Sequence, residues 1–177
     1  GEVPPEAAPR RASARPGDDL WVSHPVGGGL GDARLALEAF RGGMTPPGDD
    51  FDRVMHTNVL GPMRVLPQLA DALAPGARVA VISSRMGSIG LRTGANGGLY
   101  RASKAALNSV LKDASIVLDG RAVCVAFHPG WVRTDMGGAG ADLTPEQSVS
   151  DLRATLARLT PADNGRFLNH DGAALAW

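Results

Sequence analysis

Two continuous apolar runs, separated by one long helical pattern, constrain the fold of this chain more than any other feature. Residues 78–82 and 122–127 show no alternation of polar and apolar side chains, which is typical of strands buried on both faces. Between these runs, residues 99–118 have the pattern of a helix. A strand, a helix and a strand in this order indicate a parallel sheet covered by helices, so the sequence predicts an α/β fold.

The chain before the first run predicts a long helix. Asp49 or Asp50 can cap it, and its apolar residues keep near-helical spacing through about Leu73. Gly61 and Pro62 interrupt this pattern, so we expect a bend at that point.

Three further elements complete the alternation of strands and helices. Residues 144–147 combine a threonine cap, a proline at the first helical position and a capping-box glutamine, which predicts a helix through about Leu159. Residues 20–22 and 165–169 are expected to be short strands. About four strands are therefore expected in all.

The first 48 residues give weaker signals. Residues 1–19 are rich in Pro, Ala, Arg and Glu without a usable period, and we interpret them as an irregular leader. The glycines at 27–31 can cradle a phosphate, but no long βα pattern surrounds the short helix expected over residues 32–41, so a plain loop is the better interpretation. Residues 20–177 are expected to form a single, partial domain.

The composition excludes several classes of protein. The chain has 18 Lys and Arg against 18 Asp and Glu, so its net charge is zero and no nucleic-acid partner is expected. It has neither an apolar run of membrane-spanning length nor a secretory signal, so no membrane partner is expected. Cys124 is the only cysteine, which excludes an internal disulfide and favours the cytoplasm. His56, His128 and His170 lack metal-ligand spacing, so no metal site is predicted.

Tyr100 and Lys104 form the most informative motif for chemistry. Side chains four residues apart share one face of a helix, so the Lys104 ammonium can lie near the phenol and lower its pKa. Such a phenol can give a proton to a carbonyl or take one from an alcohol. Ser84 follows the strand of residues 78–82, and ligands lie beyond the carboxyl ends of strands in open α/β sheets. Ser84 is therefore expected to hydrogen-bond a substrate carbonyl.

Asn58 lies just before the Gly-Pro break at residues 61–62. A bent helix frees a backbone carbonyl, which can hold a water near a lysine. With Ser84, Tyr100 and Lys104, Asn58 would complete a proton relay from solvent to a carbonyl oxygen. None of these groups attacks carbon, so a hydride has to come from a cofactor.

Each member of this relay also has a plainer interpretation. A Tyr and a Lys at this spacing often share an exposed helix face, and two serines after a strand commonly form a turn. An Asn near a helix end commonly makes a local hydrogen bond. The order and spacing of the four residues together favour the relay.

On these residues the chain resembles the short-chain dehydrogenase/reductase family. The matching segments are residues 57–62, 81–87, 100–108 and 129–134. The long loop before Tyr100 and the ending through Trp177 are similar to the C-factor and sniffer-like carbonyl reductase subgroup. The resemblance covers about residues 49–177.

The resemblance implies a Rossmann-like, doubly wound parallel sheet and an NAD(P)(H)-dependent oxidoreductase of the carbonyl reductase or alcohol dehydrogenase type. Tyr100 would be the general acid/base, and Lys104 would lower its pKa and hold the nicotinamide ribose. Ser84 would orient the substrate carbonyl, and Asn58 would hold the relay water. A small carbonyl or alcohol is the implied substrate, and the chain would be a monomer or a homodimer.

The same resemblance implies the residues that hold the cofactor. Pro129 and Gly130 would pack on the nicotinamide face, and Val132 would bind its carboxamide through the backbone. Thr134 would reach the pyrophosphate. The cofactor is expected to be NADP or NAD, with NADP favoured.

The chain departs from the family in its first 48 residues, where the TGxxxGxG turn and two further βα units are not visible. It therefore resembles an N-terminally truncated member. A fragment or misread reading frame, upstream residues that are missing, and a genuinely short paralogue are the three explanations. The strand at residues 20–22 would then be an open edge, and the pyrophosphate would lose a helix N-terminus.

Two other functions are consistent with this departure. The alternative is a catalytically inactive relative that acts as a binding or signalling protein. A third class keeps the serine and tyrosine without a cofactor, as dehalogenating relatives with Arg in place of Lys do. Because this chain has Lys104 and not Arg at that position, the sequence does not favour that class.

Overall fold

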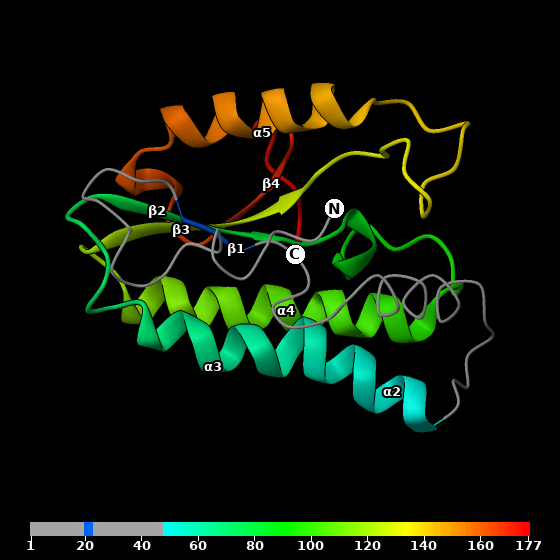
Figure 1. Cartoon of the computed structure of the whole chain (residues 1–177), viewed down its shortest axis with the longest axis horizontal. Coiled ribbons are helices and arrows are strands. Elements are labelled where there is room, and N and C mark those ends of the chain that lie inside the picture. Colours follow the sequence, from blue (N-terminus) through cyan, green and yellow to red (C-terminus); the bar gives the residue numbers. More distant parts are fainter. Residues whose placement is uncertain (1–19, 23–47) are drawn as a thin grey trace, which may run out of the picture.

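The described part of the chain is built around a parallel sheet with helices on both sides (Figure 1). The structure is a computed structural model, and it describes residues 20–22 and 48–177. The leader, the glycine loop and the helix expected over residues 32–41 lie outside the described residues.

Four strands form this sheet in the order in which they occur in the chain, and all neighbouring pairs are parallel. The predicted α/β class is thereby confirmed, and the residues that the structure describes form the four strands that were expected. Among the described residues, β1 pairs with β2 alone and so lies at one edge. The strands are β1 (Leu20–Val22), β2 (Ala77–Ile82), β3 (Ala122–His128) and β4 (Arg166–Asn169).

The helices cover the two faces of the sheet. Figure 1 shows α3 (Gly61–Gln68) and α4 (Gly98–Val117) on one face and α5 (Pro145–Arg158) on the other. Each helix connects two parallel strands, which is the doubly wound arrangement expected from the resemblance. The short α2 (Gly48–Met55) precedes α3 on the same side of the sheet.

The continuous apolar pattern of β2 and β3 follows from burial on both faces. Val79 and Val81 pack in the core between the sheet and α4, whereas Ala80 packs in the core beneath α5. Phe127 of β3 is fully buried on the α5 side. Cys124 is fully buried on the α4 side, and burial raises the pKa of its thiol to about 11, as expected for an inert core residue.

The bend expected at Gly61 and Pro62 takes the form of a π-helical turn, His56–Leu60, inserted between α2 and α3. The Gly61 N–H donates to the His56 carbonyl five residues earlier. Pro62 has no N–H, so the Asn58 carbonyl lacks the donor that an α-helix would supply four residues later. The helix ends at Gln68 rather than at Leu73, because turns replace it over residues 69–72.

The other helix ends match their sequence signals closely. Thr144 and Gln147 form the expected capping box of α5, with each side chain bonded to the other residue's backbone N–H at 3.2 Å and 2.9 Å. The helix α4 begins one residue earlier than expected, after Gly97 in a left-handed conformation.

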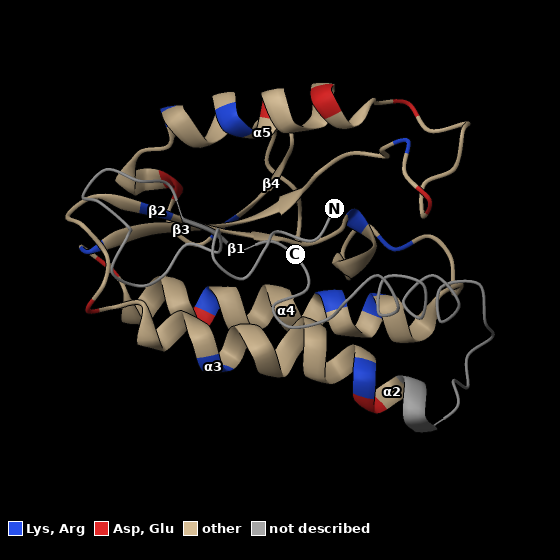
Figure 2. Ribbon diagram, in the orientation of Figure 1, with Lys and Arg blue, Asp and Glu red and all other residues tan. Residues whose placement is uncertain are grey.

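The surface of the described residues mixes both signs of charge. Figure 2 shows Lys and Arg interspersed with Asp and Glu over the helices and loops. In the part of the chain that the structure describes, no helix is both long and apolar enough to cross a membrane.

Candidate active site

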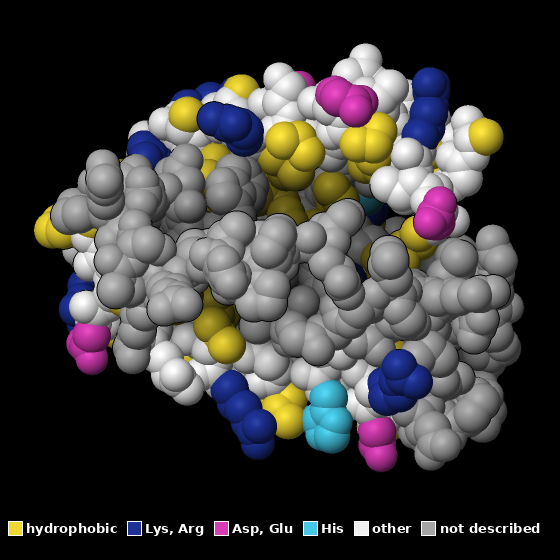
Figure 3. All heavy atoms as spheres, in the orientation of Figure 1, with side chains coloured by type: hydrophobic (Ala, Val, Ile, Leu, Met, Phe, Trp, Pro, Cys, Tyr) yellow, Lys and Arg dark blue, Asp and Glu magenta, His cyan; other side chains and the backbone are white. Residues whose placement is uncertain are grey.

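A cavity of about 780 Å³ opens at the carboxyl ends of β2 and β3, where open α/β sheets bind their ligands. Its wall includes the end of β2, the start of α4, the loop after β3 and one side of α5. Figure 3 shows hydrophobic side chains gathered on the side of α5 that faces the sheet. Six predicted site residues line the cavity, namely Ser84, Tyr100, Pro129, Gly130, Val132 and Thr134.

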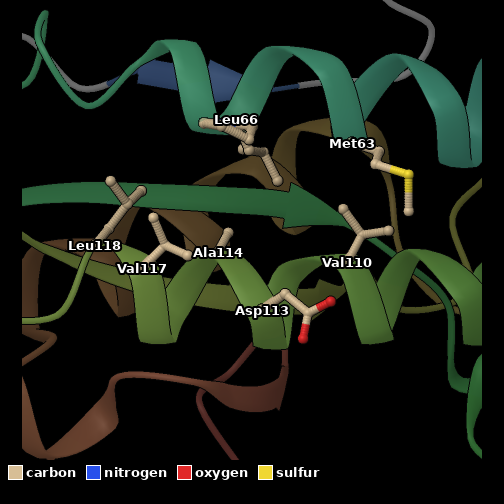
Figure 4. A pocket seen from close by; sticks show the side chains of 8 residues that line it. Met63, Leu66, Val110, Asp113, Ala114, Val117 and Leu118 are labelled. Atoms are coloured by element: carbon tan, nitrogen blue, oxygen red, sulfur yellow. The ribbon is translucent and has the colours of Figure 1, made fainter.

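A second, smaller cavity of about 100 Å³ lies between α3 and α4 (Figure 4). Its lining is apolar apart from Asp113, and none of the predicted site residues contributes to it. The candidate site therefore lies in the large cavity.

Ser84 and Tyr100 lie next to each other at the carboxyl end of β2. Ser84 is extended at the end of the strand, and its hydroxyl accepts a hydrogen bond from the Met86 N–H at 3.2 Å. Tyr100 lies in the first turn of α4 and shares a side-chain hydrogen bond with Ser84. The two hydroxyls that the sequence predicted to act on one carbonyl therefore lie within bonding distance of each other.

Lys104 lies one turn further along α4, almost fully buried behind Tyr100. Its Nζ donates to the Ile82 carbonyl at 3.0 Å and lies 5.9 Å from the centre of the Tyr100 ring. Burial lowers the pKa of Lys104 to about 8, because a buried ammonium loses hydration.

The expected effect of Lys104 on Tyr100 is wrong for this structure. Burial raises the pKa of Tyr100, and the hydrogen bond from Ser84 is the influence that lowers it. The ammonium is bonded to the end of β2 and does not offset the loss of hydration at the phenol. Proximity on one helix face was correctly inferred, but burial outweighs it.

Asn58 is buried in the π-turn and connects to α4 through Ser103. The Asn58 Nδ2 donates to Ser103 Oγ at 2.9 Å, and Ser103 Oγ donates to the Tyr100 carbonyl at 2.9 Å. The Asn58 Oδ1 is buried without a hydrogen-bond partner among the described residues. Neither Asn58 nor Lys104 lines the cavity, and both are almost fully buried.

Sequence reasoning missed Ser103, which is fully buried in this network. It also missed the clasp between β2 and α4, in which Ser83 Oγ donates to Asn108 Oδ1 at 2.5 Å. Gly87 completes the clasp, because a Cβ there would lie 2.8 Å from the Lys104 carbonyl carbon. A polar residue one turn after Lys104 on a buried helix face was the signal for Asn108.

The segment after β3 forms the opposite wall of the cavity. Gly130 has a φ of +85°, a left-handed conformation that favours glycine, and a Cβ there would also contact the Leu143 side chain. Ser148 Oγ donates to the Pro129 carbonyl at 2.6 Å and ties this turn to α5. The Thr134 hydroxyl accepts from the Gly137 N–H at 3.2 Å.

His128 also lines the cavity, although the sequence suggested only a core or surface role. Burial lowers its pKa to about 4, and the nearby His170 and Arg85 add to this effect. Its Nδ1 is buried without a partner among the described residues. His128 is therefore a neutral polar group at physiological pH.

The residues of the opposite wall fit a nicotinamide group. The Val132 N–H bonds to no described residue and is available to a carboxamide, while the Val132 carbonyl accepts from the Thr134 N–H at 2.8 Å. The cavity is also within the usual size of cofactor and small-molecule sites.

Comparison with known proteins places this geometry among oxidoreductases. The family model described as "Enoyl-(Acyl carrier protein) reductase" matches residues 41–168. The chain is 40% identical over 131 residues to the "C-signal" protein of Myxococcus xanthus, which covers 72% of this chain and 79% of that protein.

Solved structures extend the likeness to the fold. The carbonyl reductase Sniffer of D. melanogaster has a TM-score of 0.65 and 31% identity, over 82% of this chain and 73% of that one. A putative short-chain dehydrogenase/reductase from Burkholderia multivorans with bound NADP has a TM-score of 0.75 and 30% identity, over 94% and 69%. The predicted Rossmann-like sheet is thereby confirmed.

Proposed function

The chain belongs to the short-chain dehydrogenase/reductase family, and from this premise we propose that it is an NAD(P)(H)-dependent carbonyl reductase or alcohol dehydrogenase. The observation that carries the proposal is the hydrogen-bonded pair of Ser84 and Tyr100 in the wall of the large cavity. Two hydroxyls that converge at the end of β2 are placed to bind a single carbonyl oxygen.

Tyr100 is the proposed general acid in reduction and the general base in oxidation. Burial raises its pKa, so the phenol is protonated and able to donate to a carbonyl oxygen, although general acid catalysis is most efficient when the pKa lies near the operating pH. Ser84 orients that oxygen through its hydroxyl. Lys104, with a pKa of about 8, is mostly protonated at neutral pH and supplies positive charge behind the phenol.

Asn58 and Ser103 extend this group away from the cavity. Asn58 carries two buried hydrogen-bond acceptors. Its Oδ1 has no partner among the described residues, and its backbone carbonyl lacks the α-helical donor because Pro62 has no N–H. A bound water would satisfy such groups, and we assign it the role of passing the proton to the active site.

The proposed cofactor is NADP, or NAD with lower preference, and it supplies a hydride to the carbonyl carbon. Pro129, Gly130, Val132 and Thr134 would hold it together with Tyr100. Lys104 would also hold its ribose, which requires Lys104 Nζ to leave the Ile82 carbonyl that it bonds here. The NADP bound to the Burkholderia multivorans relative supports a nicotinamide dinucleotide and favours NADP. The substrate is a small carbonyl or alcohol, and the single buried cysteine fits a cytoplasmic location.

Oxidation of NADPH, followed by absorbance with a panel of ketones and aldehydes, tests the proposal. We expect turnover by the wild type and a loss of at least about a hundredfold in Tyr100→Phe, since general acid catalysis contributes on that order. Calorimetry with NADPH is the companion measurement, and tight binding would exclude the alternative of an inactive binding or signalling protein. No turnover by the wild type, or equal turnover by Tyr100→Phe, would contradict the proposal.

A further inference from the structure

The segment after β4 runs to Trp177, and Trp177 does not line the large cavity. After β4, the chain turns at residues 169–173 and runs back antiparallel to the strand, with an isolated bridge between Leu168 and Ala174. Leu175 N–H then donates to the Phe167 carbonyl at 2.9 Å. The segment from Gly172 to Trp177, which we call the C-terminal strut, is therefore fixed on β4.

The strut ends against the loop that precedes Tyr100. The main-chain carbonyl oxygen of Trp177 accepts a hydrogen bond from the Gly90 N–H at 2.9 Å and from Ser88 Oγ at 3.3 Å. The contact is close, because a Cβ on Gly90 would lie 3.3 Å from both Ala176 Cβ and the Trp177 oxygen.

The same loop forms part of the large cavity through Leu91 and Thr93. Ser88 links the two features, because its fully buried hydroxyl donates to Trp177 and also accepts from the Leu91 N–H at 3.0 Å. One hydroxyl therefore joins a residue of the cavity wall to the end of the strut.

The Trp177 side chain holds the strut in place. Its ring stacks on Phe167 with the ring centres 5.5 Å apart and the planes 24° from parallel. Phe167 is almost fully buried in the core on the α4 side of the sheet, so it is a rigid support. Stacked aromatic pairs add stability beyond the area that they bury.

We propose that the C-terminal strut fixes the cavity wall at residues 88–93, and that Trp177 thereby determines how bulky a carbonyl compound the site accepts. Trp177 is a positioning residue in this account, since it touches the loop and not the cavity. The statement about substrate size rests on the proposed function, whereas the statement about the wall does not.

Hydrogen exchange tests the wall without any substrate. In Trp177→Ala, we expect the amides of Gly90 and Leu91 to exchange about tenfold faster than in the wild type. Without the stacking on Phe167, the main-chain oxygen of residue 177 no longer holds the Gly90 N–H and the Ser88 hydroxyl, and Ser88 is in turn the acceptor of the Leu91 N–H. Trp177→Phe keeps the stacking and should behave as the wild type. Ile116→Ala is the matched control, since Ile116 is an exposed apolar residue of α4 that does not line the cavity.

The ratio of kcat/KM for naphthaldehyde to that for propanal tests the substrate statement. We expect this ratio to rise by about fivefold or more in Trp177→Ala, while the Kd for NADPH stays constant, since a looser wall admits the larger compound. A purely structural role would lower both rates together and leave the ratio unchanged.

A second variant guards against general loss of stability. If the amides of β3 also exchange faster in Trp177→Ala, the variant has lost stability as a whole, and Ser88→Ala then takes its place as the test of the strut. Ser88→Ala removes the hydroxyl that joins the loop to Trp177 and leaves the stacking of Trp177 on Phe167 intact. Because Ser88→Ala also removes the acceptor of the Leu91 N–H, the Gly90 amide is the readout in both variants, and its unchanged exchange would overturn the strut. Faster amide exchange in the loop with an unchanged ratio of kcat/KM for the two aldehydes would overturn the role of Trp177 in substrate specificity. A wild type without turnover would contradict the proposed function, and hydrogen exchange would still test whether the strut fixes the cavity wall.

Discussion

Asn58 and Ser103 join the π-turn to α4 through a hydrogen bond of 2.9 Å between Asn58 Nδ2 and Ser103 Oγ. Both side chains are almost fully buried, and Ser103 passes the connection to the Tyr100 carbonyl. The position of the phenol therefore depends on a helix that lies more than forty residues earlier in the chain.

We predict that Asn58→Ala lowers kcat by about tenfold or more, because the proposed water loses the Oδ1 acceptor and keeps only the backbone carbonyl. The Kd for NADPH should change little, since Asn58 does not line the cavity. Steady-state kinetics and calorimetry measure the two effects. Ser103→Ala is the matched variant, as it breaks the same bond and keeps the Asn58 acceptors, and its kcat should fall less. Equal kcat in Asn58→Ala and the wild type would make Asn58 a structural residue only.

Gly130→Ala should destabilise the protein and weaken cofactor binding. A left-handed φ costs an L-residue about 1–2 kcal/mol, and here the added Cβ also meets Leu143. Gly138→Ala is the matched control, because Gly138 has a φ of +75° with no atom within 4 Å of the added Cβ. Urea unfolding should show a larger loss for Gly130→Ala than for the control. Equal losses would mean that the close contact at Gly130 is easily relieved.

His128 predicts a loss of stability in acid. Its pKa is about 4 in the folded protein and about 6.5 when unfolded, so the unfolded state binds the extra proton between these values. Stability from this group is present above about pH 6.5 and is lost as the pH falls toward 4, by an amount on the order of 2–3 kcal/mol.

Urea unfolding at pH 4.5, 5.5 and 7 (values chosen to span roughly this interval) measures the effect. His128→Gln should flatten the pH dependence, whereas His56→Asn, which changes an exposed histidine, should leave it intact. A pH dependence that is the same in His128→Gln and the wild type would show that His128 does not titrate in this way.

Much of this fold follows from local sequence signals. The apolar runs correctly predicted β2 and β3, because both faces of each strand are buried. The capping box at Thr144 correctly predicted the start of α5. The π-turn was visible only as a bend at Gly61 and Pro62, since a local pattern does not show which hydrogen bonds replace the lost one. Residues 1–19 and 23–47 are not described, so the predictions made there stay predictions.

The candidate site was harder to predict in its electrostatics than in its membership. Ser84 and Tyr100 converge as expected, because the end of β2 and the start of α4 meet at one edge of the sheet. The sequence predicted a lowered pKa for Tyr100, whereas burial raises it in the structure. The hydrogen bonds of Ser103 and the position of His128 in the cavity wall were not predicted. Depth of burial decides all three cases, and it depends on tertiary packing that spacing along one helix does not report.

The most direct test of the central claim is transfer of deuterium from NADPH that is deuterated at the transferable position of its nicotinamide ring. The account predicts an alcohol product with the label on the former carbonyl carbon, formed by the wild type and at least about a hundredfold more slowly by Tyr100→Phe. An unlabelled product, or the same rate of labelling in Tyr100→Phe, would contradict it.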